Sequence, residues 1–155
     1  MKYLNLTTVQ GEEVLKKLKQ GKTYFADYGK IQFSCYVEQY KRLAKHFKFK
    51  ETPIFCAPSD ADYAIEASNC EGETIELKVP IEECHICDYY GWSDYLYYSY
   101  HWNDRYRNKK DAEDLWHYTP LEALKHLKRY LGEPKSGDTI QVVLNRIEPK
   151  WVKNI

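Results

Sequence analysis

The sequence Thr74-Ile75-Glu76-Leu77-Lys78-Val79-Pro80 alternates apolar and charged side chains with the two-residue period of a β-strand. One face of this strand would pack on a core, the other would meet solvent, and the proline would end it. Less regular patterns predict strands over 1–8, 54–57 and 63–67, and a closing strand over 139–147. Because the three middle strands follow one another directly, we predict a mostly antiparallel sheet.

Helical patterns account for much of the remaining chain. Apolar residues recur at helical spacing over 33–47 and should form one buried face, which comprises Phe33, Tyr36, Val37, Tyr40, Leu43, Ala44 and Phe47. Shorter helices are predicted over 12–20, after Thr7 and Thr8 as a helix start, and over 92–100. A capping box formed by Thr119 and Glu122 starts a helix that runs to about residue 131. We therefore predict a single α+β domain over 1–155, in which the sheet packs with about four helices.

Composition narrows the classes of partner. The chain has 155 residues with 23 Lys and Arg against 23 Asp and Glu, and this balance does not favour nucleic-acid binding. No apolar run approaches the roughly 20 residues of a membrane span, and the first residues lack the pattern of a signal peptide, so we expect no membrane partner. Five cysteines without the spacing of a disulfide framework predict reduced thiols and a cytoplasmic location.

One cluster has the residue types of a metal site. Cys84, His85 and Cys87 lie close together in the sequence, and thiolate and imidazole groups are zinc ligands. A structural zinc site needs about four convergent ligands, and no second close pair follows. Free cysteine is also a common buried residue. We therefore predict no metal at these positions.

An aromatic block over 89–106 holds seven of the fifteen tyrosines. The rings in it that could bind a ligand or a partner are Trp92, Tyr95, Tyr97, Tyr98, Tyr100 and Trp102. Arg105 and Arg107 follow and are candidates for phosphate contacts. Three readings stay open: buried core, a pocket in which a nucleotide base stacks, and a protein interface.

Three stretches resemble a family of small bacterial and phage proteins that is known only as a domain of unknown function. They are Tyr36-Val37-Glu38-Gln39, Pro53-Ile54-Phe55, and the strand 76–80 followed by Cys87-Asp88-Tyr89, Trp92 and Leu96. The family tends to have tryptophan at the positions of Cys35 and Phe55 and serine at that of Cys87. This resemblance implies no established activity.

The order strand, Thr-Thr, helix and glycine at the start, with a later strand that ends in Val-Pro, is similar to ADP-ribosyltransferase-like folds. That resemblance implies NAD as a cofactor, bound in a cleft between two small sheets. It also implies an Arg or His on the first strand, where this chain has only Asn5, Thr7 and Thr8. The resemblance further implies a serine or aromatic site residue in the middle of the chain, which would be Tyr24 or Tyr28. It also implies a catalytic glutamate late in the chain, for which the candidates are Glu148 and Glu76.

Two function classes therefore remain. In the first, the protein has a cleft for a nucleotide such as NAD: tyrosines enclose a ring, Arg105 or Arg107 meets the pyrophosphate, and a glutamate bonds a ribose hydroxyl. In the second, it is a non-enzymatic interaction protein, for instance a phage or mobile-element inhibitor that binds a host protein through residues 89–106. The sequence leaves open whether the protein is an enzyme.

Overall fold

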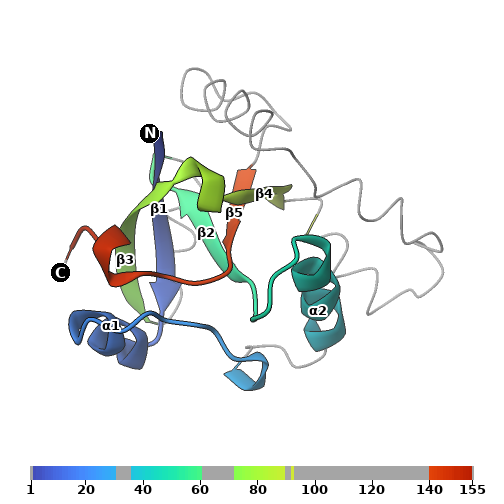
Figure 1. Ribbon diagram of the computed structural model, residues 1–155, viewed down its shortest axis with the longest axis horizontal. Helices are drawn as coiled ribbons and strands as arrows, with labels where there is room; N and C mark the ends of the chain where they lie inside the picture. Colours follow the sequence, from blue (N-terminus) through green and yellow to red (C-terminus); the bar gives the residue numbers. More distant parts are fainter. Residues whose placement is uncertain (1, 31–35, 61–71, 90–91, 93–139, 155) are drawn as a thin grey trace.

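The computed structural model describes residues 2–30, 36–60, 72–89, 92 and 140–154. Its centre is a five-stranded sheet in the order β3-β1-β2-β5-β4, in which every neighbouring pair is antiparallel (Figure 1). The strands are β1 (Tyr3–Gln10), β2 (Ile54–Pro58), β3 (Glu73–Pro80), β4 (His85–Asp88) and β5 (Ile140–Leu144). The α-helices are α1 (Glu12–Lys19) and α2 (Val37–His46), and the short 3-10 helices are η1 (Tyr28–Lys30), η3 (Ile81–Glu83) and η4 (Pro149–Trp151).

The pairing of β1 with β3 confirms the alternation predicted over 74–80. The two strands are in register from Tyr3↔Pro80 to Gln10↔Glu73, with Leu6 opposite Leu77. Ile75, Leu77 and Val79 are all fully buried, because every second side chain of β3 faces the same core. Glu76 and Lys78 therefore lie on the other face of the sheet.

The sheet has a hydrophobic cluster on each face. The larger cluster joins strand residues such as Leu6 and Val142 to Val14 and Leu18 of α1. The smaller cluster joins Val143 to α2, which Figure 1 shows apart from α1. Val142 and Val143 are consecutive on β5 and point to opposite faces, so this strand is covered on both sides.

The C-terminal segment returns from β5 to the edge of β3. Ile147 bridges Tyr24 on the way, and Val152 then bridges Leu77. The side chain of Asn154 takes the place of a neighbouring strand: its Oδ1 accepts the N–H of Glu76 at 3.1 Å, and its Nδ2 donates to the carbonyl of Thr74 at 3.1 Å. This return places residues 146–151 beside the end of β3 and the start of η3.

The predicted helices over 12–20 and 33–47 are confirmed in their main parts. α1 ends before Gly21, whose φ of 78° is the left-handed conformation that glycine favours after a helix. In α2, Leu43, Ala44 and Phe47 face the core as predicted, although the helix proper begins at Val37. Phe33 lies outside the described residues.

The predicted fold class is nevertheless wrong. About four helices were expected, with an ADP-ribosyltransferase-like fold as the candidate, but the described residues form two α-helices and one five-stranded sheet and are mostly sheet. The helices predicted over 92–100 and 119–131 and the strand over 63–67 lie outside the described residues, apart from Trp92. The prediction also missed β4, whose four residues are too few to show a period.

The predicted helix start at Thr7 and Thr8 is also wrong. Both residues belong to β1 and are buried. Their β-branched side chains suit a strand, and Thr8 Oγ1 donates to the carbonyl of Phe55 on β2 at 2.9 Å. The chain leaves the sheet at Gly11 instead, which directly precedes α1.

Candidate functional site

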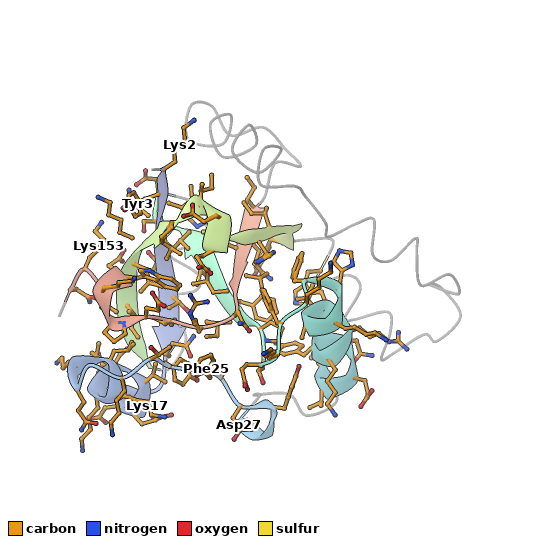
Figure 2. All side chains as sticks on the ribbon, in the orientation of Figure 1. Lys2, Tyr3, Lys17, Phe25, Asp27 and Lys153 are labelled. Atoms are coloured by element: carbon orange, nitrogen blue, oxygen red, sulfur yellow. The ribbon has the colours of Figure 1, made fainter. Side chains whose placement is uncertain are left out.

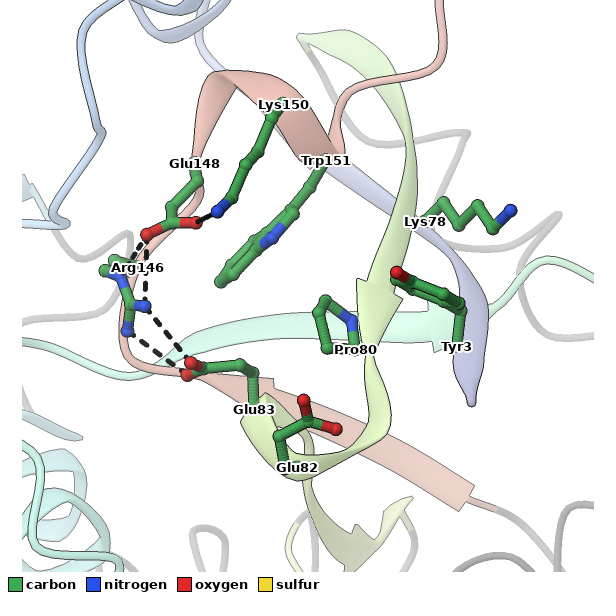
Figure 3. A pocket seen from close by; sticks show the side chains of 9 residues that line it. All are labelled: Tyr3, Lys78, Pro80, Glu82, Glu83, Arg146, Glu148, Lys150 and Trp151. Carbon is green, nitrogen blue, oxygen red and sulfur yellow. Dashed lines mark hydrogen bonds and ion pairs between the residues drawn. The ribbon is translucent and has the colours of Figure 1, made fainter. Parts of the chain in front are cut away.

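A groove of about 550 Å³ lies where the end of β3 meets η3 and the C-terminal segment. Its volume is within the range of small-molecule pockets. Figure 3 shows the nine lining residues: Tyr3, Lys78, Pro80, Glu82, Glu83, Arg146, Glu148, Lys150 and Trp151. They come from three parts of the chain that the sheet and its C-terminal return bring together.

One wall of the groove is a network of charges around Arg146. The two terminal nitrogens of Arg146 donate to the two carboxylate oxygens of Glu83, both at 3.2 Å. Arg146 Nε and Nη2 also donate to Oε1 of Glu148, at 3.2 and 3.1 Å. Lys150 Nζ lies 3.4 Å from the other oxygen of Glu148. Two cations and two carboxylates therefore neutralise one another and join η3 to the C-terminal segment.

The environment of Arg146 keeps its guanidinium charged. Partial burial lowers the pKa of Arg146, but hydrogen bonds and charge attraction from Glu83 and Glu148 together raise it above its ordinary value. Both oxygens of Glu148 are engaged by cations, so this carboxylate is occupied rather than available as a general base. Glu148 therefore holds Arg146 and Lys150 in position.

Trp151 forms the inner wall. Its side chain is only 4% exposed, and the guanidinium carbon of Arg146 lies 5.2 Å from its ring centroid. The indole Nε1 is buried and has no hydrogen-bond partner among the residues that the structure describes. An unsatisfied buried donor costs about 1–3 kcal/mol. Figure 3 shows the indole reaching between Arg146 on one side and Pro80 on the other.

The opposite end of the groove holds an exposed ring and a lysine. Tyr3 is 44% exposed, and Lys78 Nζ lies 4.9 Å from its ring centroid. Within the described part of the chain, no carboxylate lies within ion-pair distance of Lys78. Glu82 is the lining carboxylate that Arg146 and Lys150 do not pair with. This end therefore carries one lysine and an exposed aromatic ring, whereas Glu82 lies apart from them on η3 (Figure 3).

The two predicted catalytic acids lie in different surroundings. Glu148 lines the groove, whereas Glu76 is in a separate cluster on the sheet. The hydroxyl of Thr7 lies 3.1 Å from both carboxylate oxygens of Glu76, and Ser59 Oγ donates to Glu76 Oε2 at 3.1 Å. Glu76 thus joins β3 to β1 and to the turn after β2. The sequence had not suggested Ser59.

The other predicted binding residues do not meet in the groove. Tyr24 exchanges two backbone hydrogen bonds of 2.9 Å with Ile147, and burial, then the charges of Glu13 and Asp27, raise the pKa of its phenol. Tyr28 lies below Lys41, with 5.7 Å from Nζ to the ring centroid. Figure 2 shows the neighbouring Phe25 and Asp27 well apart from Tyr3.

Trp92 belongs to the smaller hydrophobic cluster. It is 3% exposed, and its ring centroid lies 5.6 Å from that of Phe55 and 5.7 Å from that of Tyr40. For this residue the core reading of the aromatic block is the one that the structure supports. The seven other predicted binding residues of this region lie outside the described part: Tyr95, Tyr97, Tyr98, Tyr100, Trp102, Arg105 and Arg107.

Cys84 and His85 have different surroundings in the structure. Cys84 is buried in the larger cluster, whereas His85 packs against Phe47 and Phe49 at ring distances of 5.0 and 4.8 Å. No group of three or more His, Cys, Asp and Glu residues in the described ranges could hold a metal ion. Burial raises the pKa of the Cys84 thiol and raises that of Cys56 to about 12, so both thiols stay protonated.

Sequence reasoning missed most of the groove. It named Glu148 but not Arg146, Trp151, Lys78 or Tyr3. The available signal was the short run from Arg146 to Trp151, in which two cations, a carboxylate and a tryptophan fall within six residues. Nothing in the sequence pairs this run with Glu83.

Comparison with protein-family models, curated proteins and solved structures finds no match for this chain. The two family resemblances therefore stay predictions. Among the described helices, none is long and apolar enough to cross a membrane.

Proposed function

We propose that the protein binds a nucleotide-like small molecule in the groove beside Trp151. The observation that carries this proposal is that Trp151, whose buried Nε1 is a donor without an acceptor in the described structure, lines a groove of about 550 Å³. A ligand that brings an acceptor to this donor would remove the cost of leaving it unsatisfied. The same groove has an exposed aromatic ring, Tyr3, at its other end.

The mixture of polar groups supports a ligand with both donors and acceptors. Glu82 is available to accept hydrogen bonds from ribose hydroxyls, and Tyr3 offers a face or edge to a base. Lys78 is available for an anionic group. A nucleotide carries all three of these features on one small molecule, and this set is the support for a nucleotide such as NAD or a part of it.

The proposal concerns binding and gives no catalytic step to either predicted acid. Glu148 is held by Arg146 and Lys150, and Glu76 is held by Thr7 and Ser59. In this reading Glu148 is a positioning residue for Arg146, and Glu82 takes the ribose contact that the sequence had suggested for Glu148 or Glu76. The alternative, a host protein bound through residues 89–106, remains a prediction about residues that are mostly outside the described structure.

Calorimetric titration with AMP, ADP-ribose and NAD tests the proposal. We expect at least one of them to bind, and Trp151→Phe to weaken that binding by about tenfold, since it removes one hydrogen bond of about 1–1.5 kcal/mol. Trp92→Phe is the matched control: it also removes an indole N–H, but from the smaller core cluster. Thermal melts without ligand show whether each variant is folded.

Two results would contradict the proposal. The first is that none of the three ligands binds at millimolar concentration. The second is that Trp92→Phe weakens binding as much as Trp151→Phe does, which would move the site away from the groove.

A further inference from the structure

We infer that Lys78 and Tyr3 select the ligand of this groove for a phosphate group next to a planar ring, so that a nucleotide binds and the corresponding nucleoside binds much more weakly. This inference rests on the proposed function and narrows its ligand class. It concerns the end of the groove at β1 and β3, away from the Arg146 network.

Most charged groups of the groove are already paired with one another. Arg146, Glu83, Glu148 and Lys150 neutralise one another through contacts of 3.1 to 3.4 Å. Of the cations that line the groove, Lys78 is the one without a carboxylate partner in the described part of the chain. An entering phosphate would have to break an ion pair to reach Arg146, but it meets no competing carboxylate at Lys78.

Without ligand, Lys78 contacts the ring of Tyr3. Its ammonium lies 4.9 Å from the ring centroid of Tyr3, and in Figure 3 it points away from Trp151. A cation–π contact at an exposed ring is weak compared with charge-assisted hydrogen bonds to phosphate oxygens. Lysine has a flexible stem with freely rotating donors, so the ammonium can leave the ring for a phosphate. That movement uncovers a face of Tyr3 for a ring.

Glu82 determines which way round a ligand lies in the groove. Its carboxylate lines the groove on η3 and repels a phosphate placed beside it, whereas it accepts hydroxyl groups. Lys78 and Glu82 thus require the anionic group at the β3 end and the hydroxyl-bearing part at the η3 end. A ribose between a base and a phosphate meets both requirements.

Titrations of AMP and adenosine into the full chain test this inference. In the unchanged protein AMP should bind at least about tenfold more tightly than adenosine, a difference of about 1.4 kcal/mol. In Lys78→Gln the two affinities should come within about twofold of each other, mainly through loss of AMP binding. Lys41→Gln is the matched control, because Lys41 also lies over a tyrosine ring but does not line the groove. This variant should keep the full preference for AMP.

The outcomes separate the inference from the function on which it rests. Equal binding of AMP and adenosine by the unchanged protein overturns the inference and leaves the proposed function standing. If neither compound binds, and ADP-ribose and NAD do not bind either, the proposed function fails and the inference fails with it. Inorganic phosphate that binds as tightly as AMP overturns the role of Tyr3 and the ring. Loss of the AMP preference in Lys41→Gln also overturns the inference, because Lys41 does not line the groove.

Discussion

Breaking the Arg146–Glu83 pair should destabilise the protein measurably, because it links two segments that are 63 residues apart. Arg146 makes two parallel hydrogen bonds of 3.2 Å to Glu83, and two further bonds to Glu148. A double-mutant cycle with Arg146→Met, Glu83→Gln and the double variant isolates the coupling between Arg146 and Glu83.

The expected coupling energy follows from the burial of the pair. Arg146 and Glu83 have side chains that are 25% and 35% exposed, so the pair is intermediate between a surface and a buried ion pair. Exposed pairs contribute about 0–1 kcal/mol, and hydrogen bonds to charged groups contribute about 1.5–3 kcal/mol when buried. We therefore expect a coupling of about 1–2 kcal/mol, and a larger total loss for Arg146→Met, since it also leaves Glu148 without its guanidinium partner.

Urea unfolding of the four proteins measures this coupling from the midpoints and slopes. The matched control is the pair Lys41 and Glu38 on α2, which lie 3.8 Å apart with side chains 53% and 77% exposed. Its cycle, with Lys41→Met and Glu38→Gln, should give a coupling below about 0.5 kcal/mol. A coupling for Arg146 and Glu83 that is no larger than that of the control pair would refute the reasoning.

Three further results are expected from the described contacts. Leu43→Ala should reduce the free energy of unfolding by about 2–5 kcal/mol in urea melts, because Leu43 is fully buried in the smaller cluster; a loss below about 0.5 kcal/mol would mean that α2 packs through another face. Cys56 and Cys84 should resist iodoacetamide in the folded protein at pH 8 and react after unfolding in urea, as read by peptide mass spectrometry. The reason is that burial raises both thiol pKa values and the thiolate is the reactive form, so equal labelling before and after unfolding would contradict their burial. Thr7→Val should cost about 1 kcal/mol, since it removes a hydroxyl 3.1 Å from the Glu76 carboxylate, and an unchanged melt would show that this cluster adds no stability.

The elements that the sequence predicts correctly are those with a regular period. The alternation in β3 and the helical stripe in α2 are each long enough to show which side chains face the core. β4 was missed because its four residues are too few for a pattern. Thr7 and Thr8 were misassigned because the local preference of threonine for helix starts gave way to pairing of β1 with β2 and β3.

Of the residues that line the groove, the sequence analysis named only Glu148 as a site residue. Glu148 was named as a catalytic acid, but in the structure it pairs with Arg146. Arg146 in turn pairs with Glu83, which lies 63 residues earlier in the sequence. Tyr3 and Lys78 come together because β1 and β3 are paired, with Tyr3 opposite Pro80. Such contacts arise from strand register and from the return of the C-terminal segment, which no local pattern encodes.

The most direct test of the proposed binding site is the indole N–H resonance of Trp151 in a nitrogen–proton NMR spectrum during titration with AMP. The chain has four tryptophans, and the Trp151→Phe variant identifies the signal. We predict that this signal moves downfield and saturates with the calorimetric affinity, because Nε1 gains an acceptor, while the Trp92 signal stays in place. A Trp151 signal that does not move while AMP binds would contradict the proposal that the ligand occupies the groove beside it.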